Sequence, residues 1–215
     1  MRISIISCLF IMVLFSCKGE KKYHDEATKV AVLKEDSKIA AIVKYQQELN
    51  AEFKNPETSP LPDRYRKDFE TLDFFPADTA YIITARLERT PQALPFSMPT
   101  NTERTSEEVV YGIAHFQLNG KNFQLEVYQN PELMQQKKYE DYLFLPFTDL
   151  TNGKETYGGG RYLDLEIPEG ETLVIDFNKA YNPYCVYNKK FSCPLVPKAN
   201  HMNTHVLAGL QDFRK

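Results

Sequence analysis

The sequence predicts a mainly β domain: a barrel-like or sandwich antiparallel sheet of about seven to nine strands, with one or two N-terminal helices. Three observations support this class. Apolar residues between 39 and 53 recur with a helical period, and from Tyr81 onward the period becomes two. Asn119-Gly120 lies between two alternating segments, the strongest short-range signal for a β-hairpin. Further short apolar runs end at Gly, Pro, Asn or Asp, as strands of such folds do.

The first seventeen residues predict export and a lipid anchor. Arg2 precedes an apolar run of 13 residues, Ile3–Phe15. A membrane-spanning helix needs roughly 20 residues, so this run is typical of a secretory signal. Leu14-Phe15-Ser16-Cys17 resembles the lipobox of bacterial lipoproteins, in which the cysteine becomes the acylated (palmitate-type) N-terminus. We therefore expect Cys17 to hold the protein on a membrane of the cell envelope, on the periplasmic or surface side.

This reading divides the chain into three parts. Residues 1–16 are the expected lipoprotein signal peptide, and residues 17–36, which are charged and poor in large apolar side chains, are an expected flexible tether. Residues 37–215 are then a single β-rich domain. The formal net charge of −3 and the lack of a basic stripe argue against a nucleic-acid partner.

The N-terminal part of the domain is predicted to be helical. Asp36 or Ser37 is a suitable cap, and Asn55-Pro56 ends the pattern. The apolar positions of this helix fall on one stripe: Ile39, Ile42, Val43, Leu49 and Phe53. A second short helix is expected around Arg64–Glu70.

The strands follow in order. Tyr81–Leu87 is the first, and the proline-rich stretch Pro91–Pro99 is a loop or a poor edge strand. Val109–Leu118 and Lys121–Gln129 then form the hairpin around Asn119-Gly120. A two-residue turn places Phe116 opposite Phe123, Ala114 opposite Leu125, and His115 opposite Gln124. His115 is therefore expected on the polar face, and not as a catalytic base.

The second half is predicted to continue with Leu143–Phe147, a hairpin of Arg161–Ile167 with Leu173–Asn178, and a last strand at His205–Gly209. The hairpin register would set Asp164 opposite Asp176, an unfavourable pairing of like charges. A bound cation, a shared proton or a bridging Arg161 would relieve it. We favour Arg161, although its alternation puts it on the other face unless Gly158-Gly159-Gly160 forms a bulge.

Tyrosines and cysteines are the other chemical signals. Seven of the 13 tyrosines lie between Tyr139 and Tyr187, which suits a pocket wall but also simple strand propensity. Cys185 and Cys193 are the cysteines left after the signal and the anchor, and in an exported protein they are candidates for a disulfide. Free thiols, or a metal or redox role, remain alternatives.

The segment Leu143–Asp149, followed by Thr151–Tyr162, Ile175–Asn178, Ala180–Cys185 and Cys193-Pro194, resembles the uncharacterised bacterial family DUF1684. The dense match covers about 139–197, and a looser one reaches back to Ser59-Pro60-Leu61. The resemblance implies an exported or soluble single-domain β-rich protein whose distinctive residues lie in its second half. It implies no reaction, cofactor or catalytic residue.

Polar residues of this segment are the candidate ligand-binding set: Glu155, Tyr157, Arg161, Asp164, Asp176, Asn178, Asn182 and Tyr184. The leading hypothesis is a lipoprotein domain without enzymatic activity that binds a small polar ligand or an envelope partner. A hydrolase that uses Asp164 and Asp176, with or without a metal, is the first alternative, and a purely structural envelope protein is the second. The cofactor is unknown, and a cell-envelope binding domain can function with none; Asp164 and Asp176 are weak metal candidates.

Overall fold

A computed structural model describes residues 23–213 of the chain. Residues up to Lys34 form one unit, and the chain from Glu35 onward forms a second, which carries all of the sheet. The elements are α1 (Tyr23–Lys54), α2 (Asp63–Arg66), β1 (Ile82–Arg89), β2 (Phe96–Pro99), β3 (Thr105–Leu118), β4 (Lys121–Gln129), β5 (Tyr142–Phe147), β6 (Arg161–Glu166) and β7 (Thr172–Asp176). Short 3₁₀ turns include η2 (Leu133–Gln135), η3 (Lys137–Tyr139), η4 (Phe177–Lys179) and η5 (Tyr184–Val186).

Helix α1 ends as predicted, at Lys54 before Asn55-Pro56, but it begins earlier. Over residues 23–36 the expected flexible tether is helical, because this stretch contains Ala, Lys and Glu and lacks Gly and Pro. On the predicted stripe, Ile42, Leu49 and Phe53 are buried, whereas Val43 is exposed. No helix within residues 23–213 combines the length and apolar character that a membrane span requires. The proposed anchor, Cys17, lies outside the described residues.

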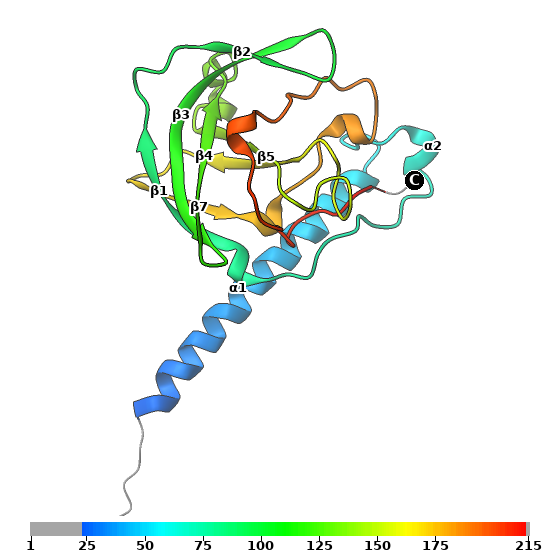
Figure 1. The fold of residues 1–215 in the computed structure, drawn as a ribbon. Coiled ribbons are helices and arrows are strands. Elements are labelled where there is room, and N and C mark those ends of the chain that lie inside the picture. The colour runs from blue at the N-terminus through cyan, green and yellow to red at the C-terminus, as the bar shows by residue number, and fades with distance from the viewer. Residues whose placement is uncertain (1–22, 214–215) are drawn as a thin grey trace, which may run out of the picture. The chain divides into compact units, whose positions relative to one another are not determined.

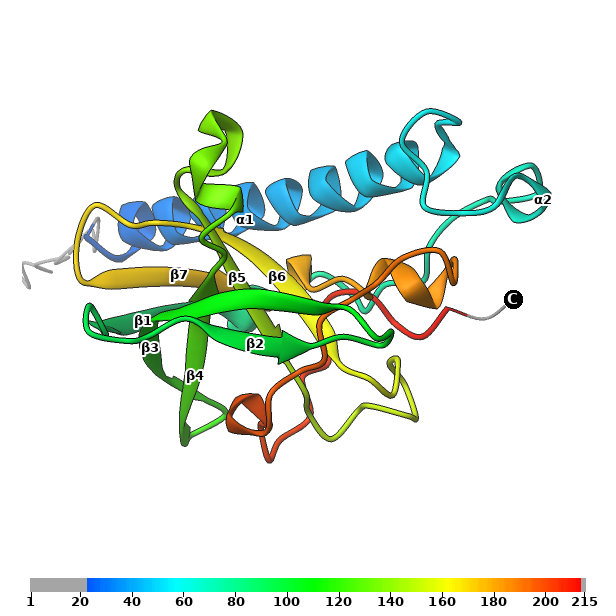
Figure 2. The same cartoon turned by 90° about the horizontal axis from the view of Figure 1, so that it is seen from above.

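The strands form one antiparallel sheet, with the order β6-β5-β4-β3-β1-β7 and with β2 paired to β3. The sheet curves into a nearly closed barrel (Figure 1), and Figure 2 shows β2 beside β3. The predicted fold class, mainly β and barrel-like with a helix at the N-terminal end, is confirmed. β2 has the edge position expected of a proline-rich strand.

The hairpin of β3 and β4 has the predicted register. Phe116 pairs with Phe123 and His115 pairs with Gln124. Asn119 and Gly120 have φ values of 52° and 73°, the positive angles that a type I′ turn requires at both positions.

The predicted hairpin between β6 and β7 is wrong. β6 pairs with β5 and β7 pairs with β1, so the two strands form opposite edges of the sheet. The partner of Asp164 is Phe144, and the partner of Asp176 is Ile82. The alternation of apolar residues determines which side chains face the core, and Leu163 does face the core. The alternation does not determine which strand pairs with β6.

The predicted last strand at His205–Gly209 is also absent. This segment instead runs into the barrel core, where Val206 and Ala208 are fully buried, and Leu210 forms an isolated bridge with Phe74. Its carbonyl groups bond to a side chain, Arg161, in place of a neighbouring strand.

Both faces of the β5–β6 part of the sheet are covered. The inner face, which carries Leu143, Leu145 and Leu163, packs in the barrel core. The outer face packs on the β2 edge and the segment 181–196 through a second apolar cluster. Its strand residues are Tyr142, Phe144 and Tyr162 from β5 and β6, and Tyr128 from β4.

Candidate functional site: a tyrosine-lined pocket

The outer face of β5 and β6 forms the floor of a cavity of about 500 Å³. Helix α1, the η2–η3 segment and the chain after β7 provide its walls. We call it the tyrosine pocket; its lining residues are Tyr45, Leu49, Glu52, Leu133, Tyr139, Tyr142, Tyr162, Asp164, Tyr181, Tyr184, Phe191, Ser192, Cys193 and Pro194. The strand residues reach it because Tyr142, Tyr162 and Asp164 alternate with core residues along β5 and β6.

Ring contacts join four aromatic side chains of the pocket into one wall. Tyr162 and Tyr181 have ring centroids 5.9 Å apart, and Tyr181 and Tyr184 are 6.4 Å apart. The wall continues from Tyr184 to Phe191 at 5.4 Å. These distances lie in the range of favourable edge-to-face and tilted aromatic pairs, so the rings hold one another in place.

Hydrogen bonds fix the hydroxyl groups of the pocket tyrosines. Tyr142 and Tyr181 donate to Oδ1 of Asp164 at 2.8 and 2.7 Å. Tyr184 donates to Oε1 of Glu52 at 2.9 Å, and Tyr162 donates to the Pro194 carbonyl. The pocket therefore exists with its polar groups already oriented, as small-molecule sites usually do.

Asp164 is the central charged group of the pocket. Its side chain is solvent-accessible because it faces the hollow, but the walls surround it on the other sides. Burial raises its pKa above the ordinary value, and the hydrogen bonds from Tyr181 and Tyr142 partly oppose that rise. Among the described residues nothing donates a hydrogen bond to its second oxygen, Oδ2, which leaves that oxygen available to a ligand.

Of the eight residues predicted as ligand-binding candidates, Asp164 and Tyr184 line the tyrosine pocket. Asp176 lines a separate groove of about 600 Å³ between the β6 and β7 edges, which Asp164 also borders. Asp176 caps η4 by accepting from Asn178, so Asp176 already has a structural partner.

Arg161 does not bridge the two aspartates. It is fully buried on the inner face and pairs with Asp149, with Nη2 and Oδ2 2.9 Å apart. It also donates to the carbonyl groups of Val206 and Ala208. The alternation of β6 was the correct guide here: Gly160 has a positive φ of 93°, but β6 runs without a bulge from Arg161.

The remaining candidates have structural or surface positions. The side chain of Asn178 accepts from the Asp78 N–H and donates to the Asp78 carbonyl. Asn182 donates to the Gln211 carbonyl at 2.8 Å. Glu155 is exposed on a loop, and Tyr157 is half-buried beside the cysteine pair. None of these four lines the tyrosine pocket.

The structure brings Cys185 and Cys193 together as free thiols. The Cys185 backbone N–H donates to Sγ of Cys193 at 3.2 Å. The Cys185 thiol also donates to Cys193, which lowers the pKa of the Cys193 thiol. A disulfide between them stays a prediction.

Helix α1 provides pocket residues that sequence reasoning missed. Tyr45 donates to the Lys179 carbonyl at 3.0 Å, 134 positions later in the chain, and Glu52 accepts from Tyr184, 132 positions later. Tyr45 and Glu52 are seven residues apart, a spacing that predicts a common helix face. No sequence pattern indicated that this face lies over β5 and β6.

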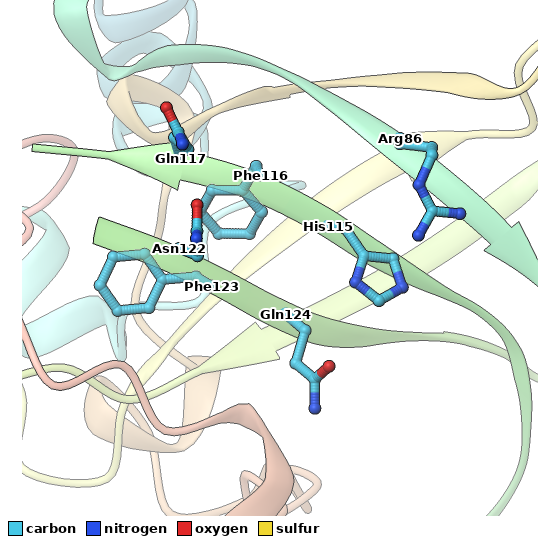
Figure 3. A pocket seen from close by; sticks show the side chains of 7 residues that line it. All are labelled: Arg86, His115, Phe116, Gln117, Asn122, Phe123 and Gln124. Carbon is cyan, nitrogen blue, oxygen red and sulfur yellow. The ribbon is translucent and has the colours of Figure 1, made fainter. Parts of the chain in front are cut away.

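A second hollow is a shallow depression on the polar face of β1, β3 and β4 (Figure 3). Arg86, His115 and Gln124 form a cross-strand row there. His115 is half-buried, with Nε2 3.2 Å from a Glu88 carboxylate oxygen, as expected of a polar-face residue. Within the described part of the chain, no group of three or more His, Cys, Asp or Glu residues is placed to hold a metal ion.

Comparisons with known proteins place the chain in a family without an assigned activity. The family model described as "Protein of unknown function (DUF1684)" matches residues 67–211. The solution NMR structure of an uncharacterized protein from Haloarcula marismortui is 30% identical, with a TM-score of 0.61, over 87% of this chain and 97% of that chain. No curated protein matches. The family match spans all seven strands, including the β5–β6 floor of the pocket, and the chain belongs to the DUF1684 family.

Proposed function

We propose that this protein is a membrane-anchored lipoprotein of the cell envelope whose domain binds a small polar ligand in the tyrosine pocket without transforming it. The pocket itself carries the binding part of the proposal. A cavity of about 500 Å³, walled by aromatic rings and holding an accessible carboxylate, is the size and composition of a small-molecule site. The signal-like residues 1–16 and Cys17 support the envelope location.

The arrangement of polar groups favours binding over catalysis. Three tyrosine hydroxyls of the pocket already donate to Asp164 and Glu52, so they orient acceptors for a ligand. A hydrolase would need Asp164 and Asp176 to act together, and Asp176 accepts two hydrogen bonds from Asn178 outside the pocket. No observation favours the hydrolase or the purely structural alternative.

A blocked pocket tests the binding proposal. Leu133→Trp adds an indole to the pocket wall, and Leu94→Trp, at a residue 82% exposed and outside the pocket, is the matched control. The full chain, in an uncharged polyoxyethylene detergent, is screened by ligand-observed NMR against small cationic, neutral and anionic solutes. We expect at least one class to bind the wild type and Leu94→Trp but not Leu133→Trp. The binding proposal fails if no solute of any class shows this dependence.

A further inference from the structure

The charge of the tyrosine pocket is negative. Asp164 and Glu52 line it, and among its described lining residues none is Lys or Arg. Oδ1 of Asp164 and Oε1 of Glu52 accept the tyrosine hydroxyls, and within the described chain no donor is bonded to the other oxygen of either carboxylate. A positively charged group that enters the pocket would pair with both carboxylates beside the aromatic rings.

Lysine ammonium groups lie near the faces of three aromatic rings that line the pocket. Nζ of Lys138 lies 5.1 Å from the ring centre of Tyr139, Nζ of Lys179 lies 5.8 Å from that of Tyr45, and Nζ of Lys190 lies 4.9 Å from that of Phe191. These lysines are at the margin of the pocket, since none of them lines it. Each distance is within the range at which a cation interacts with the face of an aromatic ring.

We propose that the ligand of the tyrosine pocket is an organic cation, with a substituted ammonium group held among the tyrosine rings and balanced by Asp164 and Glu52. This inference rests on the proposed function, because it names the chemical class of the ligand for the same pocket. The ring faces bind the alkyl groups and the positive charge, as aromatic cages do for quaternary ammonium ligands. Oδ2 of Asp164 and Oε2 of Glu52 accept any N–H or O–H of the ligand.

The arrangement favours a cation over a neutral sugar. A sugar also stacks on tyrosine and donates to carboxylates, but it brings no positive charge to either Asp164 or Glu52. Anionic ligands face direct repulsion from the two carboxylates. Of the three ligand classes, only a cation interacts favourably both with the ring faces and with the two carboxylates.

Choline and its uncharged isostere 3,3-dimethyl-1-butanol separate charge from shape. Binding to the full chain is measured by tyrosine fluorescence, which is free of tryptophan background because the chain has none, at constant ionic strength with sodium chloride as the balancing salt. Methyl glucoside and acetate are the neutral sugar and anionic probes. We expect choline to bind and the other three probes to bind at least about tenfold more weakly, since only choline carries a positive charge that the two carboxylates and the ring faces attract.

Isosteric variants assign the effect to the two carboxylates. Asp164→Asn and Glu52→Gln keep an oxygen for the tyrosine donors but remove the charge, and each is expected to weaken choline binding about tenfold or more because the ammonium loses one of its two opposite charges. Glu155→Gln makes the same change in charge on an exposed loop outside the pocket and is expected to bind as the wild type does. A thermal midpoint for each variant verifies that it is folded.

The outcomes separate the two proposals. Pocket-dependent binding of choline that both carboxylate variants weaken supports the inference. Equal binding of the uncharged isostere, stronger binding of methyl glucoside or acetate, or choline binding that is unchanged in the folded variants overturns it and leaves the proposed binding function standing. The absence of any solute that Leu133→Trp excludes overturns the binding function itself, and the inference with it.

Discussion

Arg161 and Asp149 form an ion pair that is completely buried inside the barrel, with 2.9 Å between Nη2 and Oδ2. The pair also organises backbone: Arg161 donates to the Val206 carbonyl, and Oδ1 of Asp149 accepts from the Thr151 and Val206 N–H groups. Burial lowers the pKa of Arg161, and the neighbouring carboxylate of Asp149 opposes that decrease. Several backbone groups of the C-terminal segment are therefore bonded, inside the core, to this one side-chain pair.

Replacing Arg161 should strongly destabilise the domain. Arg161→Ala leaves the buried Asp149 charge without a countercharge and several buried carbonyl groups without a donor, which costs about 3–5 kcal/mol in the free energy of unfolding. Arg86→Ala is the matched control, because the Arg86–Glu88 pair is exposed and contributes at most about 1 kcal/mol. Urea unfolding of both variants measures the difference. Similar losses in the two would show that the buried pair is not the main support of this segment.

The turn of the β3–β4 hairpin gives a second stability test. Gly120 has φ +73°, and a Cβ there would meet nothing within 4 Å, so a substitution is strained by backbone conformation alone. Gly120→Val should lower stability by about 1–2 kcal/mol. Gly170→Val, in equally open space but without a positive φ, should cost less. Equal thermal midpoints for the two variants would contradict the type I′ assignment.

The sequence predicted the features that depend on neighbouring residues. The β3–β4 register followed from Asn119-Gly120, and the end of α1 followed from Asn55-Pro56. The β6–β7 pairing failed because the Pro168-Glu169-Gly170 turn is compatible both with a hairpin and with a crossing to the far edge. No local pattern distinguishes those two connections.

The site was predictable only in part, for a related reason. Tyr184 was a candidate as a polar residue of the segment that carries the family resemblance, and Asp164 was singled out by a hairpin register with Asp176 that is wrong. Glu52 bonds to Tyr184 across 132 residues of sequence, a contact that helix periodicity cannot reveal. The strand alternation of Arg161 indicated the inner face, but its partner Asp149 lies in a turn with no regular pattern.

The cysteine pair should be joined by a disulfide in the exported protein. Cys185 and Cys193 already lie in hydrogen-bond contact, and the chain-entropy model gives roughly 2–3 kcal/mol for closing so short a loop. A reducing agent should therefore lower the thermal midpoint of the wild type but not that of the Cys185→Ser/Cys193→Ser double variant. Mass spectrometry under non-reducing conditions provides the direct measurement. Complete alkylation of both thiols in protein isolated from the envelope would refute the prediction.

The lipid anchor should depend on Cys17. Metabolic labelling with a fatty-acid probe should mark the wild type, and Cys17→Ser should remove the label, since the acyl chains attach at that residue. Cys8→Ser, within the expected signal peptide, should leave labelling unchanged. Equal labelling of the Cys17→Ser variant would show that the anchor lies elsewhere or does not exist.

Asp164 should make the domain less stable at neutral pH than an amide would. Burial raises the pKa of Asp164 in the folded protein above its ordinary value, so folding favours the protonated carboxyl. The protonated Asp164 carboxyl contributes its full stability to the folded state below the ordinary pKa. This contribution is lost as the pH rises through the raised pKa of the folded state. Asp164→Asn, which keeps an acceptor for Tyr142 and Tyr181, should therefore raise the thermal midpoint at pH 7.

The pH dependence distinguishes this cause from a general effect of charge. The advantage of Asp164→Asn should shrink on acidification to about pH 3, where the wild-type carboxyl is also neutral. Glu155→Gln, at an exposed loop position, should change the midpoint little at either pH. A destabilised Asp164→Asn variant at pH 7 would instead make the ionised carboxylate part of the support of the fold. Gain of stability on removing Asp164, together with loss of ligand binding, is the pattern of a group retained for function at a cost in stability.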